Sequence, residues 1–173
     1  MAGSDGPLRV RDARADERDA VRALTLRAYA EYASIMAPAS WAGLDGAVRA
    51  ALASDAPAER IVAVRDGVLL GSVHLFPPAT DAYGALAGRA PWPELRLLAV
   101  APEVRGLGVA RALVAECVRR ARRSGAPALG LHTSASMRVA MAMYERMGFE
   151  RAPEHDFQPA GAELVQGYRL RLE

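Results

Sequence analysis

The chain has 173 residues, of which 51% are hydrophobic and 24% charged, a composition typical of folded globular proteins rather than of disordered or fibrous ones. The length suits one domain, residues 1–173, with one sizeable core. The formal net charge is +2 and every basic residue apart from His is Arg, so the absence of Lys excludes Schiff-base chemistry and a P-loop lysine.

The first part of the chain is expected to form a strand and two helices. Leu8 and Val10 alternate with polar residues as in a strand, and Asp16 suits the N-cap of a helix. The buried face of that helix is predicted to carry Val21, Leu24 and Ala28. After a less regular stretch that contains Pro38, residues 41–53 predict a second, Ala-rich helix.

A β-hairpin is predicted next. Residues 60–65 and 68–76 are rich in β-forming residues, and the Asp66-Gly67 dipeptide between them favours the left-handed conformations of a tight turn. Residues 77–93 then form a stretch rich in Pro, Gly and Ala that is longer than the usual connection in a compact domain. We interpret it as either a substrate lid or a mobile insertion.

Strands and helices alternate in the rest of the chain. Residues 95–100 are almost continuously apolar, as expected for a central strand that is covered on both faces. The helix that follows is predicted to bury Ala110, Leu113, Val114, Cys117, Val118 and Ala121. Residues 128–133, 137–147 and 164–172 predict a strand, a helix and a final strand. A hairpin followed by β-α-β order indicates an α/β (α+β) fold with a mixed sheet and helices on both faces.

The turn before the long helix contains Gly106 and Gly108. Glycines let backbone amides point outward unobstructed, and the positive partial charge of a helix N-terminus attracts anions. The turn therefore favours a diphosphate site made by main-chain N–H groups. Its donors would be Leu107, Gly108, Val109 and Ala110, with charge added by Arg105 and Arg111. A plain strand-to-helix turn that uses glycine for tightness is the other interpretation of this spacing.

Two other nucleotide-binding motifs fit the turn less well. The Rossmann pattern requires a third glycine where Arg111 stands and an acidic residue about twenty positions later, where residues 128–131 offer none. The P-loop requires Lys followed by Ser or Thr. Both motifs are disfavoured.

Two segments resemble the motifs of the GNAT superfamily of N-acetyltransferases. Residues 97–110, Leu-Leu-Ala-Val-Ala-Pro-Glu-Val-Arg-Gly-Leu-Gly-Val-Ala, resemble the family's acetyl-CoA motif, a strand followed by Arg/Gln-x-x-Gly-x-Gly/Ala. Residues 140–149, Ala-Met-Ala-Met-Tyr-Glu-Arg-Met-Gly-Phe, resemble the family's helix that ends in Tyr-x-x-x-Gly-Phe. Two ordered motifs carry more weight than either alone. The resemblance is close from Glu94 to Phe149 and extends elsewhere only to the order of elements.

The resemblance implies a GNAT-type sheet, mostly antiparallel, with one splayed pair of parallel strands that end near Val100 and Thr133. Acetyl-CoA, the co-substrate, would lie in the gap between these strands. The pantetheine arm would pair with backbone groups of Leu98, Ala99 and Val100. One of their amides would stabilise the oxyanion that forms when an amine attacks the thioester.

Two residues are the candidate catalytic groups. An amine acceptor is mostly protonated at neutral pH, and Glu94, at the head of the central strand, is the leading general base. Tyr144 resembles the family residue whose hydroxyl lies near the sulfur and would protonate the leaving thiolate. The alternatives are a solvated carboxylate at a strand edge for Glu94 and packing on the core for Tyr144. His132 is a further candidate for base or acceptor binding, with a structural role as its alternative.

One position departs from the family pattern. Many relatives carry an Asn that contacts the cofactor seven residues before the tyrosine, where this chain has Met137. The resemblance then implies that Ser134 or Ser136 supplies this hydrogen bond instead.

The predicted function is transfer of an acetyl group from acetyl-CoA to a primary amine by direct attack in a ternary complex. A non-catalytic coenzyme A-binding sensor and a transferase for longer acyl groups are the alternatives. The acceptor, a small molecule or a peptide, is expected to bind against residues 29–41, residues 77–93 and the segment after Phe149.

No metal, membrane or nucleic acid is expected as a partner. His74, His132 and His155 share no metal-ligand spacing. No apolar run approaches the ~20 residues that span a bilayer, and residues 1–19 contain no apolar signal core, so a cytoplasmic protein is expected. The Arg-rich run at 119–123 suits a solvated helix face. A homodimer is compatible with the sequence.

Overall fold

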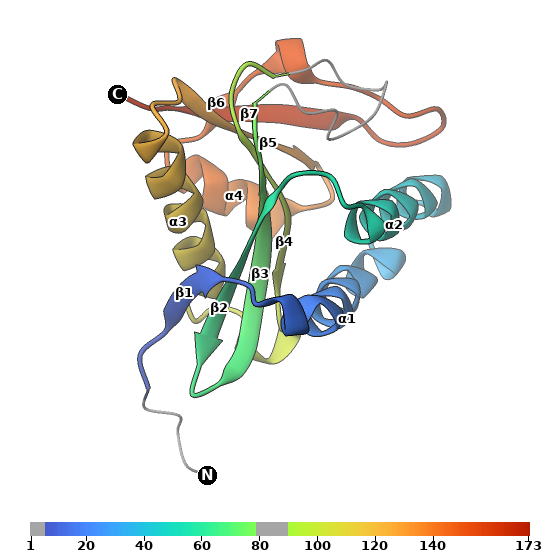
Figure 1. The fold of residues 1–173 in the computed structure, drawn as a ribbon. Coiled ribbons are helices and arrows are strands. Elements are labelled where there is room, and N and C mark those ends of the chain that lie inside the picture. The colour runs from blue at the N-terminus through green and yellow to red at the C-terminus, as the bar shows by residue number, and fades with distance from the viewer. Residues whose placement is uncertain (1–5, 79–89) are drawn as a thin grey trace.

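Seven strands form one twisted sheet in the part of the chain that the computed structural model describes, residues 6–78 and 90–173 (Figure 1). Their spatial order is β1-β2-β3-β4-β5-β7-β6, and every neighbouring pair is antiparallel except β4 and β5. The strands are β1 Arg9–Asp12, β2 Glu59–Arg65, β3 Val68–Phe76, β4 Glu94–Val100, β5 Ala128–Ser134, β6 Glu150–Arg151 and β7 Val165–Arg171. The predicted mixed, mostly antiparallel sheet is confirmed.

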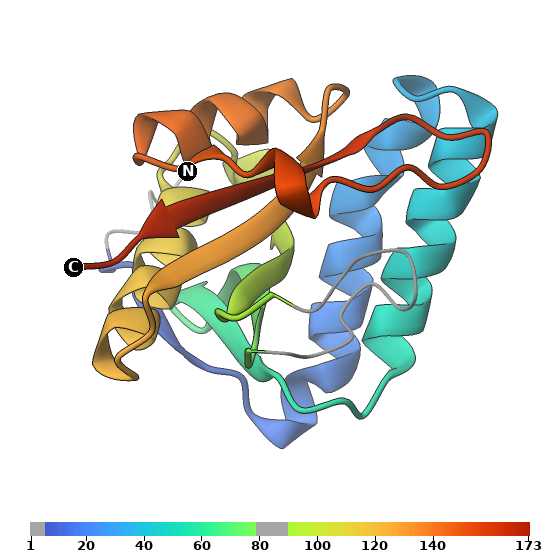
Figure 2. The ribbon, with the colours of Figure 1, turned by 90° about the horizontal axis from the view of Figure 1, so that it is seen from above.

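Helices cover both faces of this sheet (Figures 1 and 2). Helices α1, Arg18–Tyr29, and α2, Pro38–Ala53, lie side by side on one face. Helices α3, Val109–Arg123, and α4, Arg138–Arg146, lie on the other. Four short 3-10 turns, at Ala15–Glu17, Ala30–Ser34, Pro102–Val104 and Pro153–His155, complete the regular structure within the described residues.

The start of α1 differs from the prediction. Asp16 is not its N-cap, because a 3-10 turn precedes the helix and Asp16 lies inside that turn. The carboxylate that organises this turn is Glu17, which accepts the Arg14 N–H at 2.8 Å and both ends of the Arg11 guanidinium at 2.8 Å. These partners lower the pKa of Glu17 to about 2. Helix α2 likewise begins at Pro38 rather than at Trp41, since the fixed φ of proline suits the first turn of a helix.

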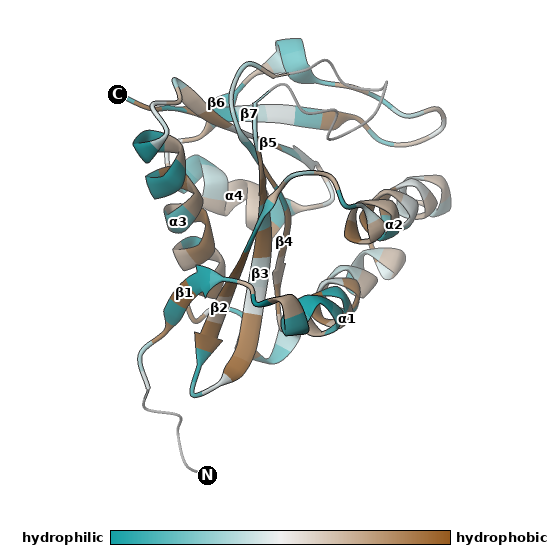
Figure 3. Cartoon of the chain, viewed as in Figure 1, coloured by the Kyte–Doolittle hydropathy of each residue, from teal (hydrophilic) through white to brown (hydrophobic). Residues whose placement is uncertain are grey.

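The largest core lies between the sheet and α3. Figure 3 shows the hydrophobic side of α3 turned toward β2 and β3 and its hydrophilic side turned outward. The central members of this core are Ile61, Val73, Leu95, Leu113, Val114, Cys117, Leu129 and Leu131. Except for Ala110, which is only partly buried, the predicted apolar face of α3 is buried as expected. Smaller clusters lie under α1, around Leu24 and Ala99, and under α2, around Val48 and Leu97.

The predicted hairpin is confirmed, whereas most of the loop after it lies outside the described residues. Strands β2 and β3 meet at Asp66 and Gly67, whose φ angles of 50° and 78° are left-handed. The predicted lid or insertion at 77–93 falls largely on residues 79–89, which the structure does not describe.

Strand β3 and helix α3 approach each other closely at Gly71. A Cβ added there would lie 2.8 Å from the Ala99 carbonyl oxygen and 2.9 Å from Cγ1 of Val109. Because Gly71 is paired with Val100 at the end of β4, glycine allows the first turn of α3 to sit directly beside that strand end. This close approach places the N-terminus of α3 where β4 finishes.

Gly71→Ala is therefore expected to lower the free energy of unfolding by about 1–3 kcal/mol, the usual cost of overpacking a filled core. Gly43→Ala is the matched control, because Gly43 lies in α2 and an added Cβ meets nothing within 4 Å. Its better helix propensity should raise stability by up to about 1 kcal/mol. Urea unfolding followed by circular dichroism measures both, and an unchanged Gly71→Ala protein would contradict the close packing.

Candidate functional site

Strands β4 and β5 are paired at one point and then separate. Glu94 lies opposite Gly130, and the Gly130 N–H donates to the Pro93 carbonyl at 2.9 Å. From there β4 follows β3 as far as Val100, while β5 follows β7 as far as Ser134. No further β4–β5 residue pair forms within the described part of the sheet. The two parallel strands therefore leave a wedge-shaped gap that is closed at Glu94 and opens toward their C-terminal ends.

A β-bulge interrupts β4 along this gap. Ser72 pairs with Ala99 and His74 with Arg96, so Val73 alone faces both Leu97 and Leu98. Leu97 takes a left-handed φ of 56°, which is rare for a non-glycine residue. An extra residue in a bulge is left out of the strand ladder, so the regular β3–β4 pairing is interrupted at Leu97 and Leu98.

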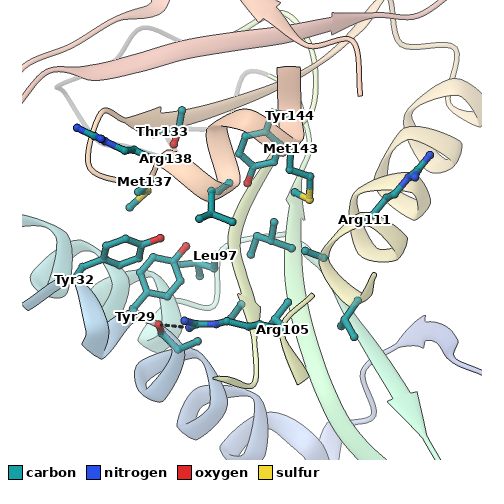
Figure 4. A pocket seen from close by; sticks show the side chains of 18 of the residues that line it. Tyr29, Tyr32, Leu97, Arg105, Arg111, Thr133, Met137, Arg138, Met143 and Tyr144 are labelled. Carbon is teal, nitrogen blue, oxygen red and sulfur yellow. Dashed lines mark hydrogen bonds between the residues drawn. The ribbon is translucent and has the colours of Figure 1, made fainter. Parts of the chain in front are cut away.

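The gap widens into an open groove of about 1250 Å³ (Figure 4). Its walls come from α1 and the 3-10 turn after it, from β4, from the first turn of α3, from the end of β5 and from α4. The lining residues include Tyr29, Tyr32, Arg96, Leu98, Ala99, Val100, Arg105, Gly106, Gly108, Val109, Ala110, Arg111, His132, Thr133, Ser136, Met137, Arg138, Met143 and Tyr144. The groove thus collects most of the residues that the sequence singled out.

The N-terminus of α3 forms one end of the groove. Gly106 and Gly108 have φ angles of 78° and 80°, and a Cβ added at either would meet nothing within 4 Å. The helical ladder starts with the Ala112 N–H donating to the Gly108 carbonyl at 3.0 Å, so the N–H groups before Ala112 have no acceptor inside the helix. Such a turn fits a diphosphate. Arg111 lies at its side, whereas Leu107 is 58% exposed outside the groove lining.

Arg105, which the sequence predicts to add charge at this turn, also binds α1. Its guanidinium forms an ion pair with Glu31 and donates to the Ala28 carbonyl at 3.1 Å (Figure 4). Because the Glu31 carboxylate compensates its charge, Arg105 ties the glycine turn to α1. Arg111 is the basic residue of the motif that stays beside the first turn of α3.

Glu94 and Tyr144 are both buried, so neither is a solvated surface group. Tyr144 projects from α4 toward the gap, with its ring centroid 5.7 Å from that of Phe149 (Figure 4). Glu94 lies at the closed end of the gap, behind the residues that line the groove, and its Oε1 is 3.7 Å from Nδ1 of the groove-lining His132 on β5. The structure therefore brings His132 to the predicted base, an association that the sequence did not indicate.

Ser134 does not reach the groove. Its hydroxyl donates to Oε1 of Glu163 at 3.1 Å, and the hydroxyl of Ser136 donates to Oε2 of the same carboxylate at 3.0 Å. The Glu163 N–H donates in turn to Ser40 Oγ at 2.9 Å, so this cluster ties the chain before β7 to the start of α2. Ser136 and Met137 line the groove instead of Ser134.

Several residues that line the groove carry no sequence motif of their own. Tyr29 and Tyr32 belong to the segment predicted to bind the acceptor, and their three-residue spacing could have placed them on one helical face. Both rings point into the groove in Figure 4, with centroids 5.9 Å apart. Burial raises the pKa of both hydroxyls. No sequence pattern indicated that the side chains of Arg96 and Thr133 line the groove, because strand pairing and the β4 bulge set their positions.

The described residues contain no cluster of three or more His, Cys, Asp or Glu side chains arranged to hold a metal ion. Within the same residues, no helix combines the length and apolar character that crossing a membrane requires.

The splayed strands and the glycine turn at a helix N-terminus are the features that the resemblance to the GNAT superfamily predicts. Residues 21–149 match the model of the acetyltransferase (GNAT) family. Since this match spans more than half of the chain, the protein belongs to the GNAT family of acyl-CoA-dependent N-acyltransferases. The family and the enzyme class predicted from the two sequence motifs are confirmed.

A curated relative and several solved structures resemble the chain. The chain is 38% identical over 96 residues to the mycothiol acetyltransferase of Cellulomonas flavigena, and the match covers 55% of this chain but only 27% of that protein. An acetyl-CoA complex of a GNAT acetyltransferase from Brucella melitensis superposes with a TM-score of 0.60 and 22% identity, covering 97% of this chain and 90% of that one.

Two further structures share the fold. The coenzyme A complex of PaiA N-acetyltransferase from Thermoplasma acidophilum has a TM-score of 0.64 and 15% identity over 93% of this chain and 98% of that one. The ribosomal-protein-S18-alanine N-acetyltransferase of Escherichia coli has a TM-score of 0.64 and 17% identity over 96% and 95%. At these identities the likeness concerns the fold.

Gly108→Val is expected to weaken coenzyme A binding by at least about tenfold, the equivalent of one lost hydrogen bond to a charged group. The new side chain would occupy the open space at the first turn of α3 and strain a φ of 80°. Isothermal titration with coenzyme A measures the change. Gly125→Val, at the opposite end of α3 with a φ of 74°, introduces similar strain away from the groove. Equal affinities of the two variants would rule out the glycine turn as the binding site.

Proposed function

We propose that this protein transfers an acetyl group from acetyl-CoA to a primary amine by direct attack in a ternary complex. The observation that carries the proposal is the gap between β4 and β5, which is closed at Glu94 and leads to the open N-terminal turn of α3. One end of the gap suits a diphosphate and the other holds buried acid–base groups. A linear thioester co-substrate fits between them.

Main-chain groups hold the co-substrate in this proposal. The N–H groups of the first turn of α3 bind the diphosphate, with Arg111 beside them. The backbone at Leu98, Ala99 and Val100 pairs with the pantetheine arm in place of β5, from which β4 has separated. Of the two serines predicted for this hydrogen bond, Ser134 and Ser136, the one that lines the groove, Ser136, takes the role.

The bulge in β4 supplies the oxyanion donor. Two residues, Leu97 and Leu98, face one residue of β3. One of their two amides is therefore left without a partner in the β3–β4 ladder and can bind the oxyanion. Where water is excluded by bound substrates, a fixed N–H aimed at a developing negative charge is worth more than in water. The Leu98 amide is our assignment for this donor.

Glu94 and Tyr144 carry out different proton transfers, one as base and the other as acid. Glu94, a carboxylate at the closed end of the gap, removes the proton that keeps the acceptor amine from attacking. Tyr144, whose side chain enters the gap from α4, protonates the sulfur of the departing coenzyme A. Acceptor and co-substrate are then bound together, and the enzyme forms no covalent bond to the acetyl group.

The direct test is a screen of primary amines that follows free coenzyme A with a thiol reagent. The panel contains peptide N-termini, polyamines and aminoglycosides, each with acetyl-CoA and with a longer acyl-CoA. Burial raises the pKa of the chain's one thiol, Cys117, to about 12, so the native enzyme adds little signal of its own. Release of coenzyme A in the presence of an amine supports the proposal. Faster release from the longer acyl-CoA would show that the transferred group is not acetyl. Tight binding of acetyl-CoA without release of coenzyme A would identify a sensor.

Tyr144→Phe is expected to lower kcat by about 10²-fold, within the range of general acid catalysis, and to change coenzyme A affinity little. Glu94→Gln should lower kcat/KM for the amine by a similar factor, about 10². Tyr168→Phe is the matched control, because that buried hydroxyl donates to Glu145 at 3.1 Å and lies outside the groove lining. An unchanged kcat in Tyr144→Phe would show that the acid is another group.

A further inference from the structure

An ammonium acceptor must lose two protons during acetyl transfer. The first leaves before the nitrogen can attack the thioester, because a protonated amine has no free electron pair. The second leaves the nitrogen of the adduct as the amide forms. Tyr144 gives a proton to the sulfur in the proposed function and cannot act as a base before that step. A single carboxylate holds one proton at a time, so a second acceptor beside Glu94 lets the site take both protons before either reaches solvent.

His132 is placed to be that second acceptor. It lies on β5, directly after the point where β4 and β5 are still paired, and its Nδ1 is 3.7 Å from Oε1 of Glu94. Both side chains are about 90% or more buried, with exposures of 4% for His132 and 10% for Glu94. Catalytic hydrogen bonds are often long before substrate binds and shorten in the complex with substrate.

The other ring nitrogen fixes which tautomer His132 adopts. Nε2 lies 2.8 Å from the His155 carbonyl oxygen, an atom that only accepts hydrogen bonds. Nε2 must therefore carry a hydrogen, and in the neutral ring Nδ1 presents its lone pair to Glu94. A lone pair facing a carboxyl group receives the proton that the carboxyl group has collected.

Asp156, the acidic residue next to His155 in the chain, forms its ion pair with Arg151. Asp156 follows the 3-10 turn that contains His155, and its two oxygens accept both ends of the Arg151 guanidinium at 2.8 and 2.7 Å. Asp156 also accepts the Gly167 N–H at 2.8 Å, and together these bonds lower its pKa. The His155 ring packs on Trp92, with centroids 5.0 Å apart, and leaves its carbonyl as the contact to His132.

We propose that Glu94 and His132 act as one acceptor of two protons. This inference rests on the proposed function and adds a residue to it. Glu94 takes the first proton from the ammonium group, and its Oε1–H passes that proton to Nδ1 of His132, which becomes an imidazolium. Glu94, again a carboxylate, takes the second proton from the adduct nitrogen. One of the two protons replaces the one that Tyr144 gave to the sulfur, and the other is released to solvent.

The kinetic test compares ethylamine with trifluoroethylamine at neutral pH. Ethylamine arrives protonated, whereas fluorine withdrawal leaves trifluoroethylamine largely neutral, so only ethylamine must lose both protons on the enzyme. His132→Gln keeps an N–H donor for the His155 carbonyl but binds no proton. In His132→Gln we expect kcat for ethylamine to fall by about tenfold or more, which is part of the rate enhancement that a general base provides. We expect kcat for trifluoroethylamine to change by less than about twofold. Glu94→Gln should impair both amines.

A spectroscopic measurement tests the tautomer without turnover. In long-range nitrogen–proton NMR spectra of protein labelled at histidine, neutral His132 should carry its hydrogen on Nε2. His155→Gln removes the neighbouring ring but keeps the carbonyl, and the His132 tautomer should persist. A hydrogen on Nδ1 of neutral His132 would overturn the inference even if no amine is acetylated. Equal losses for both amines in His132→Gln would overturn it while leaving the acetyltransferase proposal intact.

Discussion

The separation of β4 from β5 is the constraint on which the rest of the site depends. It begins at one pair, Glu94 opposite Gly130, and Gly130 is fixed there because a Cβ would lie 2.5 Å from Nε1 of Trp92. Beyond this point each strand has a different partner, so the backbone edge of β4 has no strand beside it among residues 6–78 and 90–173. A polar edge without a partner inside a folded domain calls for a ligand that supplies hydrogen bonds.

The arginines near this framework mostly hold its parts together. Arg105 joins the glycine turn to α1 through Glu31, and Arg151 holds Asp156 beside β7. Arg120, whose side chain is 10% exposed, pairs with Glu116, Asp12 and Glu59 and so ties α3 to β1 and β2. The pKa of Glu116 is lowered to about 2 by its arginine partners. Many of the arginines thus form intramolecular ion pairs, and several of these pairs link one element of the fold to another.

Sequence predicted what local patterns determine and missed what strand pairing determines. The apolar spacing of α3, the Asp66-Gly67 turn and the glycine turn at Gly106 are local, and each appears as expected. The β4 bulge was not foreseen, because it depends on how Leu97 and Leu98 pair with β3. The contact of Glu94 with His132 likewise exists only because β4 and β5 are neighbours. Ser134 does not line the groove, and its hydroxyl donates to Glu163, a carboxylate distant in sequence.

The proposed co-substrate site is built largely from main chain and so places few demands on side chains. The reported structures share 15–22% identity with this chain and superpose with TM-scores of 0.60–0.64. Helix N–H groups and a strand edge bind a co-substrate through atoms that every residue carries, so they require glycine at few positions. Groups that exchange protons must be specific side chains. Selection on Glu94, His132 and Tyr144 is therefore expected to be stronger than on the aliphatic residues of β4, whose contribution is made by their backbone.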